Sequence, residues 1–155
     1  MINCIQKLVP LALLLCTLTA CEPADDRPGF WLSGESQAFP EDWSFTDDVR
    51  EISVQVETPY FLAHSVTIWC AQLEGTLYVG ALEPQSKNWP GWVEDSPIVS
   101  LKVADKIYQA KLFKVNEADL KAKIAARYTE KYQLSPGGAF EGDASAWYWR
   151  VSPTG

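Results

Sequence analysis

The stretch that decides the fold is His64-Ser-Val-Thr-Ile-Trp-Cys-Ala-Gln-Leu-Glu-Gly-Thr-Leu-Tyr-Val-Gly80. It is rich in β-branched and aromatic residues, which are enriched in β-strands. Glu74-Gly75 separates two such runs by two residues, and a two-residue connection with glycine is typical of a tight hairpin. The stretch therefore predicts two antiparallel strands, over 64–73 and 76–80.

Four further strands are predicted around this hairpin. Ile52, Val54 and Val56 alternate with polar residues, which is the two-residue period of a strand with one buried face. The other three expected strands cover 98–103, 107–115 and 145–152. Because six strands joined mainly by hairpins must bury their apolar face, closing the sheet into a small barrel is the economical arrangement.

Two helices are expected between these strands. A short one begins near Ser86, after the third strand. A longer one runs from about 117 to 132, where Leu120, Ile124 and Tyr128 recur at helical spacing. The sequence thus predicts an α+β fold, a mainly antiparallel six-stranded barrel with a short helix after the third strand and a longer helix before the last strand.

The first twenty residues predict export. Lys7 precedes an apolar run over 8–18, which small residues follow. The run is shorter than the roughly 20 apolar residues that a membrane-spanning helix needs. Leu18-Thr-Ala-Cys21 resembles a bacterial lipobox, in which the chain is cut before the cysteine and that cysteine receives acyl chains such as palmitate. The other interpretation is an ordinary signal peptide with an incidental cysteine.

These features divide the chain into four parts. We expect a lipoprotein signal peptide over 1–20, a lipidated Cys21 with a tether to residue 29, an N-terminal arm over 30–50 and the barrel domain over 51–155. The N-terminal lipid would hold the protein at a membrane without spanning it. Glu22 rather than Asp follows the cysteine, which favours the periplasmic face of the outer membrane.

The charge of the exported part limits its partners. The chain has 13 Lys and Arg against 20 Asp and Glu, and Lys7 is the one charged residue among the first 20, so 12 basic residues remain and the formal charge becomes −8. A domain this acidic repels nucleic acid, and we expect no nucleic-acid partner. His64 is the only histidine, which excludes a metal site built on imidazoles.

Only one cysteine is left for the folded domain. Cys4 and Cys16 lie in the predicted signal and Cys21 is expected to carry lipid, so Cys70 remains alone and no internal disulfide is expected. Apolar residues alternate along 64–73, which makes Cys70 a buried strand residue. A redox thiol is the other interpretation.

The order of several short motifs resembles a known superfamily. From Glu51 to Val151 the chain resembles the split β-barrel of the pyridoxamine-phosphate oxidase and flavin reductase superfamily, especially its short deazaflavin-dependent nitroreductase-like and uncharacterised members. The motifs that carry this resemblance are Thr67-Ile-Trp69, Gly75-Thr-Leu-Tyr-Val79, Ser86-Lys87, Pro97-Ile-Val99, Ala126-Arg-Tyr128 and Lys131-Tyr132.

The resemblance implies a cofactor site and a homodimer. In cofactor-binding members the lysine of the Ser-Lys pair touches the phosphate of a flavin or deazaflavin, and the second strand borders the ring. Carried onto this chain, Lys87 and Ser86 would hold the phosphate of FMN or a deazaflavin. His64 is either a further phosphate contact or proton donor at the rim, or a surface residue. The residues beside the ring would be Thr67, Ile68 and Trp69.

Two hypotheses for the function follow. The first is a flavin- or deazaflavin-dependent oxidoreductase, in which the cofactor supplies the hydride chemistry and the protein binds and orients it. The second is a non-catalytic lipoprotein that binds a small ligand or a partner protein through an aromatic cleft. In the second hypothesis Trp89 and Trp92 flank an expected Pro-Gly turn and stack on the ligand.

Overall fold

The structure is a computed structural model that describes residues 29, 31–135 and 146–155. The predicted signal peptide and Cys21 lie outside the described residues. The strands are β1 (Glu35–Gln37), β2 (Glu51–Glu57), β3 (Ala63–Leu73), β4 (Thr76–Leu82), β5 (Ile98–Val103), β6 (Lys106–Lys114) and β7 (Ala146–Ser152). The α-helices are α1 (Trp89–Asp95) and α2 (Ala118–Tyr132), and the 3-10 helices are η1 (Ser44–Thr46) and η2 (Pro84–Ser86).

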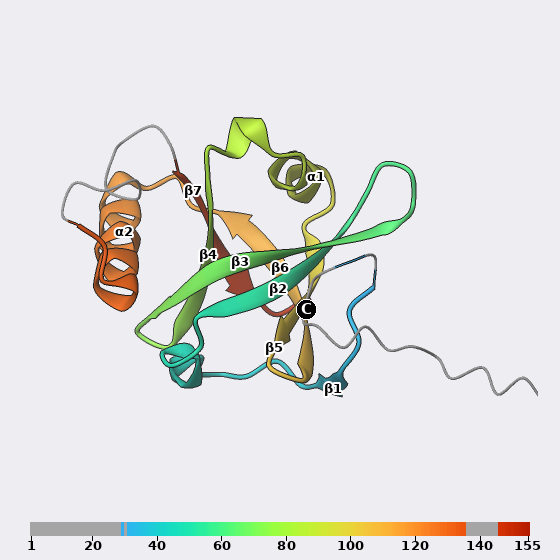
Figure 1. Cartoon of the computed structure of the whole chain (residues 1–155), viewed down its shortest axis with the longest axis horizontal. Coiled ribbons are helices and arrows are strands. Elements are labelled where there is room, and N and C mark those ends of the chain that lie inside the picture. The colour runs from blue at the N-terminus through green and yellow to red at the C-terminus, as the bar shows by residue number, and fades with distance from the viewer. Residues whose placement is uncertain (1–28, 30, 136–145) are drawn as a thin grey trace, which may run out of the picture.

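The strands form one sheet that closes into a barrel (Figure 1). Their order is β1-β6-β5-β2-β3-β4-β7, and β7 also pairs with β6, which closes the ring. Every pairing within the ring is antiparallel, whereas β1 lies parallel to β6 outside it. The predicted fold class, an α+β six-stranded split barrel with a short and a longer helix, is confirmed.

β3 changes its partner along its length. Residues 63–69 pair with β2, whereas residues 70–73 pair with β4 through the expected tight hairpin at Glu74-Gly75. β4 continues to Leu82 paired only with β7. β3 and β4 therefore diverge beyond the Cys70–Val79 pair, and the barrel wall is split there.

Two apolar cores stabilise the barrel. The inner core takes alternate residues of the strands, such as Val54 and Ile68, together with Trp43 from the N-terminal arm. The outer core lies under α2, which covers β3, β4 and β7 and buries Ile124 and Tyr128 completely. Cys70 lies in the inner core without exposed surface, as its place in the alternating pattern predicts.

Tyrosine hydroxyls of α2 bond to the backbone where the split opens. The hydroxyl of Tyr128 donates toward the carbonyl of Trp69 at 3.0 Å. The hydroxyl of Tyr132 accepts the N–H of Cys70 at 3.0 Å and lies 2.7 Å from the carbonyl of Arg50. An unpaired buried backbone group costs about 1–3 kcal/mol, so α2 stabilises the place where β3 changes partner.

Two local expectations need correction. The short helix expected near Ser86 is instead the 3-10 helix η2, which ends there, and the α-helix begins only at Trp89. Pro90-Gly91 is part of that α-helix and is not a turn, because proline is accepted in the first turn of a helix, where its missing N–H has no intrahelical partner. β1 was not predicted, because three residues are too few to show an alternating pattern.

No helix within the described part of the chain is long and apolar enough to cross a bilayer.

The Tyr132 hydroxyl provides a test of the split. We expect Tyr132→Phe to lower the free energy of unfolding by about 1–3 kcal/mol, because the buried N–H of Cys70 loses its acceptor. Urea unfolding followed by far-ultraviolet circular dichroism measures the change. Tyr60→Phe is the matched control on an exposed tyrosine, with an expected change below about 0.5 kcal/mol. Equal effects in the two variants would contradict the assignment.

Candidate functional site

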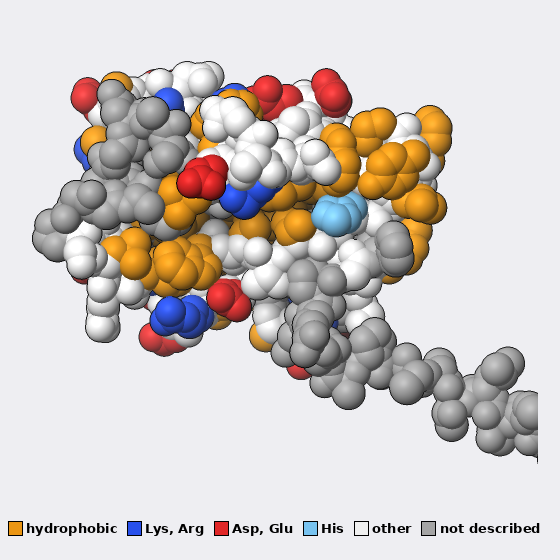
Figure 2. All heavy atoms as spheres, turned by 45° about the horizontal axis from the view of Figure 1, so that its top comes forward, with side chains coloured by type: hydrophobic (Ala, Val, Ile, Leu, Met, Phe, Trp, Pro, Cys, Tyr) orange, Lys and Arg blue, Asp and Glu red, His pale blue; other side chains and the backbone are white. Residues whose placement is uncertain are grey.

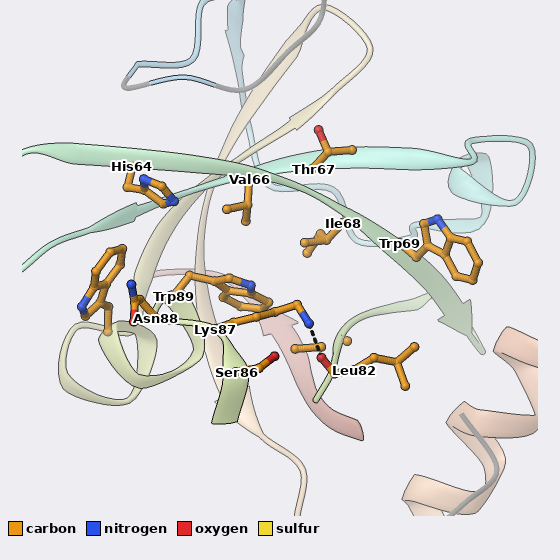
Figure 3. Close-up of a pocket in the computed structure, with 13 residues that line it drawn as sticks. His64, Val66, Thr67, Ile68, Trp69, Leu82, Ser86, Lys87, Asn88 and Trp89 are labelled. Atoms are coloured by element: carbon orange, nitrogen blue, oxygen red, sulfur yellow. Dashed lines mark hydrogen bonds between the residues drawn. The ribbon is translucent and has the colours of Figure 1, made fainter. Parts of the chain in front are cut away.

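A cleft of about 560 Å³ lies where β3 and β4 diverge (Figure 3). It is bounded by β3, by the end of β4 and by the segment that carries η2 and the start of α1. The six site residues predicted from the sequence are all among the residues that line it. The lining consists of His64, Val66, Thr67, Ile68, Trp69, Gly80, Ala81, Leu82, Ser86, Lys87, Asn88, Trp89 and Trp92.

Side chains of β3 point alternately toward the cleft and away from it. Val66 and Ile68 point from the strand toward Lys87 and Trp89, whereas Thr67 points away from them (Figure 3). This follows from the two-residue period of a strand, in which neighbouring side chains lie on opposite faces. Of the three residues expected beside a cofactor ring, Ile68 therefore forms the apolar wall, whereas Thr67 lies on the opposite face of β3 and Trp69 stacks on Tyr132.

Ser86 and Lys87 lie at the polar corner of the cleft. The hydroxyl of Ser86 donates to the carbonyl of Glu83 at 2.8 Å, and the ammonium of Lys87 donates to the carbonyl of Leu82 across the cleft (Figure 3). The backbone N–H groups of both residues are bonded within the η2 turn, to the carbonyls of Glu83 and Pro84. An anion would thus meet the side chains of Ser86 and Lys87 rather than their two backbone amides.

The aromatic lining is mostly packed against the protein. Trp89 is buried and lies 5.1 Å from the ring of Trp149, so it is a core residue whose edge borders the cleft. Trp92 is half-buried and makes an edge contact of 5.3 Å with His64. Trp69 stacks on Tyr132 at 4.2 Å with nearly parallel rings. The expectation of two exposed tryptophans flanking a turn is therefore wrong for Trp89.

The charge of the cleft is carried by one side chain. Lys87 is the only Lys or Arg among the lining residues, which are all within the described part of the chain, and no carboxylate lines it. With the apolar side chains of β3 and Trp89 opposite, the cleft suits a ligand that has one anionic end and a flat apolar body.

Cys70 does not belong to this site. Its side chain is fully buried in the barrel, and burial raises the pKa of the thiol although the Lys131 ammonium lies 3.7 Å from the sulfur. A thiol held protonated and away from solvent is a poor nucleophile. The interpretation of Cys70 as a buried strand residue is the one that fits.

Sequence reasoning missed several lining residues. Val66 shares a strand face with His64 and Ile68, and this period was visible in the sequence. Leu82 and Ala81 had no such signal, because they enter the cleft only where β4 leaves β3 to pair with β7. Gly80 and Asn88 had none either.

The fold is shared with solved structures of several kinds. A pyridoxamine 5′-phosphate oxidase-like protein of Listeria innocua superposes with a TM-score of 0.57 at 12% identity, covering 72% of this chain and 90% of that one. HutZ, the haem storage protein of Vibrio cholerae, gives 0.57 at 12% identity, with 72% and 86% covered. The F420-H2 dependent reductase FDR-A gives 0.53 at 13% identity, with 67% and 95% covered.

At these identities the likeness shows the split-barrel fold alone. No protein-family model matches the sequence, and no curated protein is significantly similar to it.

Gly80 tests how tightly the cleft wall is packed. A Cβ there would lie 3.2 Å from Cδ1 of Tyr148 and 3.4 Å from the hydroxyl of Tyr128, and both rings are buried. We expect Gly80→Ala to lower the free energy of unfolding by about 1 kcal/mol or more. Gly91→Ala in α1 is the matched control, since in the described part of the chain no atom outside the neighbouring residues and the backbone of that helix lies within 4 Å of an added Cβ, and alanine favours the helix by up to about 1 kcal/mol. Thermal unfolding measures the change in stability of both variants. A Gly80→Ala variant that is more stable than wild type would contradict the tight packing of the cleft wall.

Proposed function

We propose that the cleft binds a flavin or a deazaflavin and that the protein is an oxidoreductase held at the membrane of the cell envelope. The observation that carries this proposal is the meeting of Ser86 and Lys87 with the apolar face of β3 in one cleft. When bound, such a cofactor supplies hydride transfer.

The lining fits this class of cofactor. The cleft volume of about 560 Å³ lies within the range of about 300–1,000 Å³ that is usual for sites of small molecules and cofactors. Lys87 and Ser86 would hold the phosphate, and Val66, Ile68 and the edge of Trp89 would lie against the ring. The ammonium of Lys87 has three N–H donors. One donates to the carbonyl of Leu82, and the other two can donate to a phosphate.

A second candidate function rests on the same structure. The polar groups of Ser86 and Lys87 already bond to backbone carbonyls, and much of the lining is apolar or aromatic. A non-catalytic module that binds a small apolar ligand or a partner protein here would need no phosphate contact. Both candidates are compatible with a homodimer, which the split-barrel resemblance implies.

Cofactor titration of the full chain tests the first candidate. We expect binding of FMN or a deazaflavin, followed by the change in its absorption and fluorescence. Lys87→Ala should weaken binding by about tenfold or more, because a hydrogen bond to a charged group contributes about 1.5–3 kcal/mol. Lys123→Ala, on the exposed face of α2, is the matched control with unchanged affinity.

Two outcomes of that titration and one of a parallel haem titration separate the hypotheses. Unchanged affinity in Lys87→Ala removes this residue from the site. A protein that binds none of FMN, FAD or a deazaflavin contradicts the enzyme proposal and leaves the binding module. Haem is titrated in parallel, since HutZ stores it and His64 lines the cleft. A haem absorption band that is lost in His64→Ala would replace the flavin proposal.

The membrane attachment is proposed from the sequence. Residues 8–18 and Leu18-Thr-Ala-Cys21 support export, cleavage and acylation at Cys21, with the periplasmic face of the outer membrane as destination.

Mass spectrometry of the protein from membranes tests this attachment. We expect a mature chain that begins at Cys21 and carries the added mass of acyl chains, and we expect Cys21→Ser to abolish both cleavage at this site and acylation. Cys16→Ser is the matched control within the signal and should leave the mature mass unchanged. A wild-type chain without acyl mass would contradict the proposal.

A further inference from the structure

The turn between β2 and β3 presents large apolar side chains to solvent. Tyr60, Phe61 and Leu62 are 57%, 85% and 52% exposed. Trp31 of the N-terminal arm and Ile98 of β5 are 74% and 55% exposed, and both line one shallow hollow together with Phe61 and Leu62. We call these five residues the apolar tip. Figure 1 shows the turn projecting beyond the barrel, and Figure 2 shows hydrophobic side chains gathered at that end beside His64.

The turn is held in a defined conformation. The hydroxyl of Thr58 donates to the carbonyl of Leu62 at 2.7 Å and also lies 3.2 Å from its N–H. The N–H of Phe61 donates to the carbonyl of Thr58 at 3.0 Å. Phe61 itself has a φ of 60°, a left-handed conformation that is uncommon for a bulky residue. The hydrogen bonds of the turn thus hold a backbone conformation in which the apolar side chain of Phe61 is exposed to solvent.

The acidic side chains around the apolar tip determine which kind of lipid surface it can contact. Glu57 lines the hollow of the apolar tip. Glu57 and Asp95 both line a neighbouring hollow, to which Trp92 also contributes. No Lys or Arg lines either hollow within the described part of the chain. An anionic surface is therefore repelled, whereas neutral or zwitterionic headgroups are not.

The proposed lipid anchor lies close to the apolar tip along the chain. Gly29 accepts hydrogen bonds from the N–H and the hydroxyl of Ser65, and Ser65 follows Leu62 by three residues. Gly29 follows Cys21 by eight positions, and a fully extended chain over eight positions spans at most about 29 Å. A lipid on Cys21 would therefore keep Gly29 within this distance of the bilayer surface, and Gly29 bonds to Ser65 close to the turn that carries the apolar tip.

We propose that the apolar tip inserts into the interface of a zwitterionic bilayer as a second contact beside the lipid anchor. Tyr and Trp are suited to this place, since their rings are apolar and their polar groups reach the headgroups. The inference rests on the proposed anchoring at Cys21. Because Trp92 contacts both Tyr60 and His64, the inserted tip holds one end of the cleft next to the membrane.

The test uses the full, processed chain in phosphatidylcholine vesicles with a nitroxide attached at Phe61→Cys. We expect collisions of the nitroxide with oxygen to rise and those with a water-soluble nickel complex to fall when vesicles are present. Ala122→Cys, on α2 away from the turn in Figure 1, is the matched control and should keep the values seen in water. Adding phosphatidylglycerol should weaken the contact, because Glu57 and Asp95 repel anionic headgroups.

Two results would overturn the proposal. A nitroxide at position 61 that stays accessible to the nickel complex on vesicles shows that the tip remains in water. Dipolar broadening between labels without vesicles shows that the tip joins two copies of the chain. A second variant, Trp31→Ser with Leu62→Ser, should return the label to its values in water.

The anchor is checked separately in the same preparation. In wild type the buried Cys70 is protected from labelling and an acylated Cys21 has no free thiol, so labelling of wild type detects a missing anchor without reference to the tip.

Discussion

The structure depends on the way β3 shares its backbone hydrogen bonds. A buried strand must pair its N–H and C=O groups, and β3 pairs first with β2 and then with β4. At the change of partner some groups lose a strand neighbour, and Tyr128 and Tyr132 of α2 supply the hydrogen bonds that are missing. The barrel can therefore close and yet remain split, and α2 is needed where it lies.

The split has a second consequence, because it opens the barrel wall without exposing the core. Val66 and Ile68 line the gap on one side, and Gly80 to Leu82 line it on the other. The segment with η2 and α1 lies across it and contributes both the buried Trp89 and the exposed Lys87. One strand divergence thus brings an apolar wall and a single cation together, although they are far apart in the sequence.

The fold does not decide what the cleft binds. Split barrels of similar shape include an oxidase-like protein, a haem storage protein and an F420-H2 dependent reductase, so the chemistry lies in the site residues. Among the described residues that line the cleft, Lys87 is the only Lys or Arg, and its ammonium bonds to the carbonyl of Leu82. The binding of any anion here therefore depends on whether that one ammonium meets the ligand.

The sequence by itself determined the elements. Alternation over 52–56 and 64–73 and helical spacing from Leu120 to Tyr128 are local patterns, and the structure has strands and a helix there within one or two residues. The burial of Cys70 followed from the same alternation. Local patterns also placed Lys87 in the segment after the third strand. Its expected role at a phosphate came from the motif order from Glu51 to Val151, which resembles the split barrels.

Only the tertiary structure decided how these elements meet. The change of partner by β3, the pairing of β1 with β6 and the position of Leu82 in the cleft join residues that are distant in the sequence. Such pairings depend on register and on closure of the whole sheet, which no local pattern records. The same reason explains why Trp89 is a core residue rather than an exposed ring: its neighbour Trp149 arrives from the last strand.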